Sequence, residues 1–319
     1  MTIGDHLDEL YGLPAYTFPG PNAPQTDLPD AEAVAWRITS DVYDADEDWK
    51  VAFTRFCETV DPHRVRALIV GAWQDAYESG SSVVIEALTG AKERFPALRA
   101  LFVGDMVMEE CEISWINQSD VTPLLAAFPR LEVFGVRGGT GLEFSGLSHA
   151  SLRRLTMETG GLPAAVVRGV GASDLPALEH LDLWLGTPDY GGDSEVSDLE
   201  GVLSGARLPR LRQLALRNSE MQDAVAAAVA AAPVVAQLEV LDLSMGVLTD
   251  EGAAALLAGQ PLTHLKKLDL HHHYLSDALQ ERVRQTLEAA GVEVDLDRSD
   301  ADEDEGDDGT VWRYVSVGE

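Results

Sequence analysis

The stretch Leu238-Glu-Val-Leu-Asp-Leu-Ser-Met-Gly-Val-Leu-Thr-Asp-Glu-Gly-Ala-Ala-Ala-Leu-Leu257 decides the fold of this 319-residue chain. It opens with leucines in the spacing L-x-x-L-x-L, passes through a short loop and ends in a run of alanine and leucine. The alternation around Leu241 and Leu243 predicts a strand. Thr249, followed by two acidic residues, is a typical helix N-cap. The stretch therefore predicts one strand–loop–helix unit.

The same frame recurs along the chain. Eight copies start at Val65, Leu98, Leu131, Leu152, Leu178, Leu211, Leu238 and Leu265, and a partial ninth starts at Gly291. Chance leucine spacing is the alternative, and eight matching frames disfavour it. Such a period is the signature of leucine-rich repeats, whose stacked units share one core. We therefore expect an α/β leucine-rich-repeat solenoid, a horseshoe with a parallel β-sheet on the concave face and helices on the convex face.

The chain divides into four parts by composition and pattern. Residues 1–30 are rich in proline and should form an irregular lead-in. Residues 31–64 should form an N-terminal cap, with a strand at Val34–Ile38 and an amphipathic helix that carries Trp49, Phe53 and Phe56 on one face. Residues 65–297 hold the repeats. Residues 298–319 should form an acidic loop and a capping strand, in which Val311–Val317 pairs with Val292–Leu296 and covers the last sheet edge.

The charge is strongly negative, because 54 acidic residues face 23 basic ones and the net charge is −31. Such a charge disfavours nucleic acid and anionic membranes, and it favours a partner protein with a basic surface. The first residues lack the basic and apolar regions of a signal peptide, and no apolar run is long enough to span a bilayer. Two cysteines, Cys57 and Cys111, make no disulfide framework. We expect two free thiols and a cytoplasmic location.

The repeat frame also predicts which side chains face a partner. The leucines of L-x-x-L-x-L point into the core, so the residues between and beside them point outward on the concave face. Neighbouring strands then place these outward residues in rows across the sheet. The predicted partner-binding residues are Arg154, Glu158, His180, Asp182, Trp184, Arg217, Asp242, Asp269 and His271.

Trp184 is the centre of this predicted surface. Tryptophan and arginine are enriched among the residues that dominate binding energy, and Trp184 should stand between Glu158 and Arg217. The competing interpretation is that inserted loops cover Trp184 and make it part of the core.

A metal site at His271, His272 and His273 is disfavoured, because consecutive strand residues point in different directions and zinc needs three or four convergent ligands. Only His271 should face the concave side, near Asp242 and Asp269. These three residues define the alternative function, a metal- or small-molecule-binding enzyme component. His273 is expected to occupy the position where leucine-rich repeats carry asparagine.

Known catalytic and cofactor motifs are missing from the sequence. There is no G-x-x-x-x-G-K-[ST] phosphate loop, and the acidic run from Asp295 has neither the glycine nor the final glutamate of an EF-hand. The cysteines also differ from the C-x-D sites of ubiquitin ligases that are attached to bacterial leucine-rich repeats. We expect no catalysis of its own and no cofactor.

The repeats resemble those of ribonuclease-inhibitor-like proteins, most clearly in LTDEGAAALL (248–257) and LEVLDLS (238–244). The whole chain is similar to an uncharacterised family of bacterial leucine-rich-repeat proteins described only as cytoplasmic. The segments CEISWINQSDVTPLL (111–125), LEHLDLWLGTPDYGGD (178–193) and KKLDLHHHYLSDA (266–278) carry this resemblance. It implies a concave surface that grips a folded partner, and it implies no activity. The expected function is an intracellular protein-binding scaffold, adaptor or regulator of a partner enzyme.

Overall fold

A computed structural model describes residues 4–23, 27–43, 45–306 and 308–318. The strands are β1 (Glu9–Leu10), β2 (Leu13–Thr17), β3 (Ala35–Ile38), β4 (Ala67–Val70), β5 (Ala100–Val103), β6 (Val133–Arg137), β7 (Arg154–Glu158), β8 (His180–Gly186), β9 (Gln213–Ser219), β10 (Val240–Asp242), β11 (Lys267–Asp269), β12 (Glu293–Asp295), β13 (Glu303–Glu305) and β14 (Val311–Arg313). The α-helices are α1 (Trp49–Thr59), α2 (Ser82–Gly90), α3 (Thr122–Ala127), α4 (Ala164–Ala172), α5 (Glu200–Ser204), α6 (Gln222–Ala230), α7 (Asp250–Ala258) and α8 (Asp277–Leu287).

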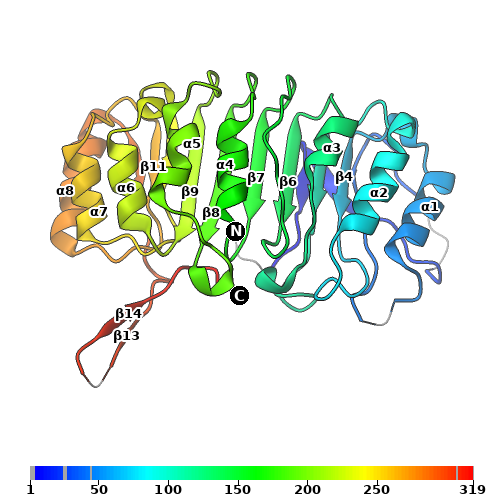
Figure 1. Ribbon diagram of the computed structural model, residues 1–319, viewed down its shortest axis with the longest axis horizontal. Coiled ribbons are helices and arrows are strands. Elements are labelled where there is room, and N and C mark those ends of the chain that lie inside the picture. Colours follow the sequence, from blue (N-terminus) through cyan, green and yellow to red (C-terminus); the bar gives the residue numbers. More distant parts are fainter. Residues whose placement is uncertain (1–3, 24–26, 44, 307, 319) are drawn as a thin grey trace.

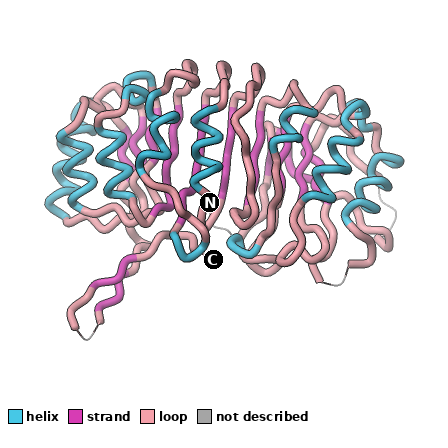
Figure 2. The backbone as a smooth tube through the Cα atoms, viewed as in Figure 1, coloured by secondary structure: helices cyan, strands magenta, loops and turns pink. Residues whose placement is uncertain are grey.

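One long sheet organises the molecule. Among the described residues, this sheet has twelve strands, which lie side by side in chain order from β1 to β12. The pairings from β2 to β12 are parallel, and only β1 pairs antiparallel with β2. Figure 1 shows the helices in a row in front of the sheet, and Figure 2 shows the same separation of helices from strands. We call the opposite side of the sheet the helix-free face. The predicted α/β class and parallel sheet are confirmed, and the arrangement is solenoid-like.

An observed strand lies in each repeat frame, at the place that the leucine spacing predicts. The strands β4 to β12 all begin two residues after the start of a frame. Leu241 pairs in register with Leu214 on one side and with Leu268 on the other. Leu241 and Leu268 are both fully buried, as the frame requires, and belong to one apolar core that runs through the stack. The core therefore grows along the chain as units are added.

Side-chain caps begin the helices α7 and α8, and the sequence predicts the one at Thr249. The hydroxyl of Thr249 accepts a hydrogen bond from the backbone N–H of Glu251, and that of Ser276 accepts one from Leu279. These bonds satisfy N–H groups that have no partner inside a helix. The chain thus turns from loop into helix where its sequence changes from polar residues to the alanine- and leucine-rich run.

The carboxyl ends of the strands share an unusual turn. Gly138, Asn218, Met245 and His272 occupy equivalent places in their frames, and all have positive φ angles. His273 follows one of these turns and is buried; its Nε2 bonds to the carbonyl of Leu296 at 3.2 Å, and its Nδ1 accepts from the N–H of Leu275 at 3.1 Å. His273 therefore joins two units through their backbones.

The N-terminal region is more ordered than predicted. The strand β3 and the helix α1 form where the sequence placed them. Within residues 1–30, positions 1–3 and 24–26 lie outside the described residues. The described part of this region contributes two more strands, β1 and β2. The prediction of an irregular lead-in is wrong for this part. The strand β2 extends the parallel sheet beyond β3. Apolar contacts made by Leu7 and Leu10 with strands far along the chain account for the difference.

The predicted pairing of Val311–Val317 with Val292–Leu296 is wrong. The strand β14 pairs antiparallel with β13, and this hairpin projects from the body in Figure 1. Among the described residues, β12 pairs only with β11 and remains the last strand of the sheet. The strand β14 pairs with β13, which is nearer in the sequence than β12, because closing a short loop costs less chain entropy than closing a longer one. Within the described residues, no helix is long and apolar enough to cross a membrane.

Candidate functional site

The N-terminal segment covers one end of the helix-free face. Leu7 and Leu10 pack against Ala35, Ile69 and Phe102, which point away from the helices on β3, β4 and β5. Backbone contacts fix the segment in place. The N–H of Leu7 donates to Asp105 at 3.0 Å, and its carbonyl accepts from Arg37. This part of the face is therefore filled by the chain itself.

The C-terminal segment covers another part of the same face. Val317 is buried in a small cluster with Ile113, Trp184 and Met245, apart from the main core. Trp184 is only 2% exposed. The sequence correctly places Trp184 on the side of the sheet away from the helices, but the prediction that it is exposed is wrong. The sequence pattern does not show that a segment 133 residues further along the chain lies over it.

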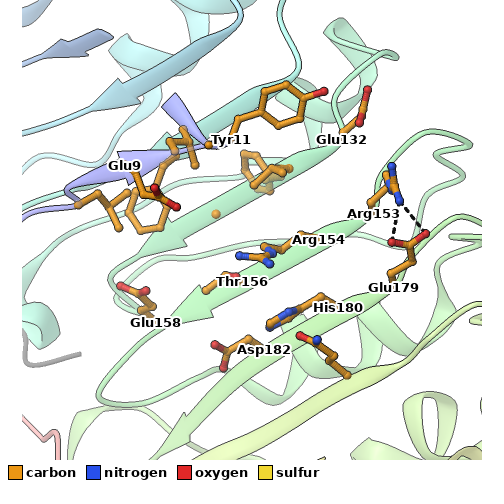
Figure 3. Close-up of a pocket in the computed structure, with 18 of the residues that line it drawn as sticks. Glu9, Tyr11, Glu132, Arg153, Arg154, Thr156, Glu158, Glu179, His180 and Asp182 are labelled. Atoms are coloured by element: carbon orange, nitrogen blue, oxygen red, sulfur yellow. Dashed lines mark hydrogen bonds and ion pairs between the residues drawn. The ribbon is translucent and has the colours of Figure 1, made fainter. Parts of the chain in front are cut away.

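Between the two covered regions lies an open groove of about 720 Å³. Its floor comes from β6 to β9, and Tyr11 at the β1–β2 turn forms part of its wall (Figure 3). Gly135 lies in the floor beneath Phe102, where an added Cβ would come within 2.3 Å of the Phe102 ring. The volume is in the range of sites that hold small ligands or the anchoring side chains of a partner.

A rim of alternating charge follows the amino ends of the strands. Residues just before successive strands form cross-strand ion pairs, and Figure 3 shows the one between Arg153 and Glu179. The pairs are Arg99 with Glu132 at 3.8 Å, Arg153 with Glu179 at 2.9 Å, and Lys266 with Glu239 at 2.7 Å. Exposed pairs of this kind add little stability. They place both positive and negative side chains along the rim.

A buried ionic row lies at the other side of the groove. Asp105 accepts from Arg37 at 2.7 Å, and Arg137 binds Glu158 at 2.8 Å while lying 3.7 Å from Asp105. Burial opposes ionisation of Asp105, but the hydrogen bond from His6 and the two arginines outweigh it and lower the pKa of the carboxyl. Burial raises the pKa of Glu158 despite its contact with Arg137. This row ties the N-terminal segment to β3, β6 and β7.

Arg217 is the centre of a second ionic group. It makes two hydrogen bonds to Asp182, at 2.7 and 3.0 Å, and lies 3.6 Å from Asp242. Its guanidinium also lies over the ring of Trp184. Burial lowers the pKa of Arg217, but the neighbouring carboxylates reverse this effect and raise it. Burial raises the pKa of Asp242, and Arg217 only partly offsets that rise.

The predicted corner at Asp269 and His271 differs in detail from the sequence interpretation. His271 Nδ1 lies 2.7 Å from Asp269, and Lys267 lies 3.0 Å from the same carboxylate. Asp269, His271 and Asp295, not Asp242, bring one potential metal-ligand atom each within 4.8 Å of one another. The hydrogen bond that His271 donates to Asp269 raises the pKa of His271. Burial opposes ionisation of Asp269, yet the hydrogen bonds from His271 and Lys267 lower its pKa. The ammonium of Lys267 therefore already neutralises this corner.

Arg154 differs from the other groove cations. It is exposed in the floor and pairs in register with His180 on the next strand (Figure 3), and its guanidinium forms no ion pair or hydrogen bond within the described part of the chain. Burial lowers the pKa of His180, and the charge of Arg154 lowers it further. Nδ1 of His180 and Nε1 of Trp184 are buried without a hydrogen-bond partner among the described residues. Of these groups, only the cation of Arg154 is open to solvent in the groove.

The nine predicted residues all lie on the helix-free strands or their ends, but they separate into groups. Six of them line the open groove: Arg154, Glu158, His180, Asp182, Trp184 and Arg217. Glu158, Asp182, Trp184 and Asp269 are buried, while Arg217, Asp242 and His271 are half-buried in ion pairs. The sequence interpretation missed Asp105, Arg137 and Asn218. Asp105 and Asn218 are buried polar residues at strand ends, and only this position in the frame could have signalled them.

The chain matches no protein-family model, and no curated protein is significantly similar to it. Among solved structures it is similar to a protein from Bacteroides fragilis, with 31% identity and a TM-score of 0.73. The match covers 79% of this chain and 70% of the other. The chain belongs to the same protein family as that Bacteroides fragilis protein. The family relation extends the shared fold to most of both chains, and no activity is transferred with it.

Proposed function

We propose that the repeating units are leucine-rich repeats and that the sheet forms the concave face of a horseshoe. This face binds a partner protein in the cytoplasm, and the chain acts as a scaffold, adaptor or regulator of that partner. The single observation that carries the proposal is the open groove over β6 to β9, with Arg154 free in its floor. Rigid strands position its side chains, which lowers the entropy lost when a partner binds.

The composition of the groove suits a protein surface. Its lining combines the apolar Leu10 and Val133 with charged residues of both signs, and a mixed apolar and polar surface is typical of protein interfaces. The exposed guanidinium of Arg154 can donate hydrogen bonds to an acidic side chain of the partner. The net charge of −31 favours a partner whose surface is otherwise basic, with association that slows as salt increases.

A photo-crosslinking amino acid at Gln213 tests the proposal. Gln213 lines the groove, and Glu86 on α2 is exposed on the helix side and serves as the matched position. Crosslinking in the native cytoplasm, followed by mass spectrometry, should identify one protein with the label at Gln213 and not with the label at Glu86. Equal products at the two positions, or none at either, would contradict the proposal.

A metal- or small-molecule-binding enzyme component remains the alternative. The observation that favours it is the convergence of Asp269, His271 and Asp295. The nearby Lys267 disfavours it, since its ammonium is already 3.0 Å from Asp269. Metal analysis of the purified protein discriminates the two functions: stoichiometric zinc or manganese, lost in Asp269→Asn, would support the alternative.

A further inference from the structure

The segment Tyr314–Gly318 lies on the helix-free face as a bound peptide would. Its hydrogen-bond partners come from distant parts of the chain near β5, β9, β10 and β11. The N–H of Ser316 donates to the carbonyl of Met245 at 2.8 Å. At one end, Tyr274 donates its hydroxyl to the carbonyl of Tyr314 at 2.8 Å. At the other end, Ser114 donates to the carbonyl of Gly318.

Asn218 holds the middle of this segment through its backbone. Its Nδ2 donates to the carbonyl of Val317 at 2.7 Å, and its Oδ1 accepts from the N–H of Val317 at 2.9 Å. The residue is fully buried and has a φ of 53°, a conformation that asparagine tolerates better than most residues. Because the amide pairs with both backbone groups of one residue, it holds an extended chain whatever the side chain is.

One side chain of the segment enters a pocket. Val317 is buried against Ile113, Trp184 and Met245, whereas the side chain of Tyr314 is half exposed. Main-chain hydrogen bonds combined with pockets for particular side chains are the means by which many domains recognise extended peptides. The surface therefore selects an extended backbone and a β-branched aliphatic residue at one position.

The charges around the segment select a basic neighbour. Arg313, four residues before Val317, binds Glu303 at 2.7 Å. Asp304 accepts from the hydroxyl of Tyr314 at 3.0 Å, and Asp300 lies 3.4 Å from His272. A basic residue just before the bound stretch is thus attracted by an acidic hairpin, and an acidic one is repelled.

We propose that the surface beneath Tyr314–Gly318 is a binding site for an extended partner segment that carries a basic residue four positions before a valine or isoleucine. The chain's own segment fills this site until such a partner displaces it. The inference rests on the proposed function, since it names the chemistry of part of the partner. A tethered occupant has an effective concentration on the order of millimolar, so an outside peptide competes poorly with it in the wild type.

A fluorescein-labelled peptide of sequence RYVSVG, the sequence of residues 313–318, tests the proposal on the full chain. Val317→Asp should release the tethered segment without changing the pocket, and the variant should bind the peptide at least tenfold more tightly than the wild type in fluorescence anisotropy. Tyr274→Phe is a second, milder variant, which removes the hydroxyl that bonds to the carbonyl and the N–H of Tyr314. It should also tighten binding.

Three controls define the specificity. Peptide RYVSDG should bind Val317→Asp at least tenfold more weakly, because a carboxylate would enter the apolar pocket. Peptide EYVSVG should also bind more weakly, with a difference that shrinks in high salt. Adding Asn218→Asp to Val317→Asp should remove binding, since a carboxylate accepts but cannot donate to the peptide carbonyl.

Circular dichroism should first show that each variant is folded. If folded Val317→Asp and Tyr274→Phe both bind RYVSVG no more tightly than the wild type, or if RYVSDG binds equally well, the inference is overturned. This assay needs no native partner. Its failure therefore leaves the crosslinking result at Gln213 intact, and a failure of crosslinking with peptide binding preserved contradicts only the proposed function.

Discussion

The guanidinium carbon of Arg217 lies 5.0 Å from the ring centre of Trp184, on the neighbouring strand and at the same register position. The indole also packs in one apolar cluster with Val317 of the C-terminal segment. Arg217 in turn holds Asp182 and approaches Asp242. Through these contacts the side chain that the sequence suggested as an exposed binding residue connects the terminal segment to the sheet.

Trp184→Ala should therefore destabilise the protein. Removing a fully buried aromatic side chain costs about 3–5 kcal/mol, because its contacts are lost and a cavity remains. The free energy of unfolding, measured in urea, checks this. Trp115→Ala is the control; Trp115 is 59% exposed, and its replacement should change stability by less than about 0.5 kcal/mol. Equal effects of the two substitutions would contradict the burial of Trp184.

Leu241→Ala and Leu268→Ala should each cost about 2–5 kcal/mol. Both leucines are fully buried and adjacent in register, so each truncation opens a cavity in the shared core. Leu257→Ala on the half-buried side of α7 should cost less. Because the two core leucines touch the same layer, the double variant should deviate from additivity. Unfolding midpoints that do not change for Leu241→Ala would remove this residue from the repeat core.

The pair His271–Asp269 should make stability depend on pH. The hydrogen bond that His271 donates to Asp269 raises the pKa of His271 above 6.5, and the charges of Asp242 and Asp295 raise it further. Its stabilising contribution is therefore fully present below pH 6.5 and is lost as the pH rises through the folded-state pKa. NMR titration of His271 should give a pKa above 6.5 in the wild type and a lower one in Asp269→Asn. A pKa that is the same in both would contradict the pairing.

Cys57 and Cys111 should be two free thiols that react slowly. Both are buried and unpaired, and burial raises the pKa of each to about 11. Since the thiolate is the reactive form, alkylation of the native protein at pH 8 should be much slower than that of a small thiol. Denatured, unreduced protein should give two thiols per chain. A count near zero would show a disulfide and would argue against a reducing compartment.

The strands could be predicted from the sequence because their signal is local. Leucines in the spacing of Leu238, Leu241 and Leu243 define a strand and its inward face within six residues. The register then follows, since Leu214, Leu241 and Leu268 occupy one place in successive frames. The cap at Thr249 was also predicted correctly, because a polar residue followed by two acidic residues is a local signal.

The covering segments could not be predicted in this way. Leu7 binds Asp105 from 98 positions away, and Val317 binds Asn218 from 99 positions away. Neither segment carries the leucine spacing of the repeats, and both are held largely through backbone groups, which every residue has. The groove is the part of the helix-free face that these segments leave open, so its position could not follow from the repeats. Arg154 was identified from its register, while its lack of a partner appears only in the structure.

The most direct test of the account is the affinity of the crosslinked partner for Arg154→Glu. Arg130→Glu is the matched control, because Arg130 is exposed outside the groove. This substitution changes the net charge by the same amount as Arg154→Glu. If the partner occupies the groove, Arg154→Glu should raise the dissociation constant at least tenfold, about 1.4 kcal/mol, and Arg130→Glu should change it less than twofold. Equal dissociation constants for the two folded variants would contradict binding at this groove.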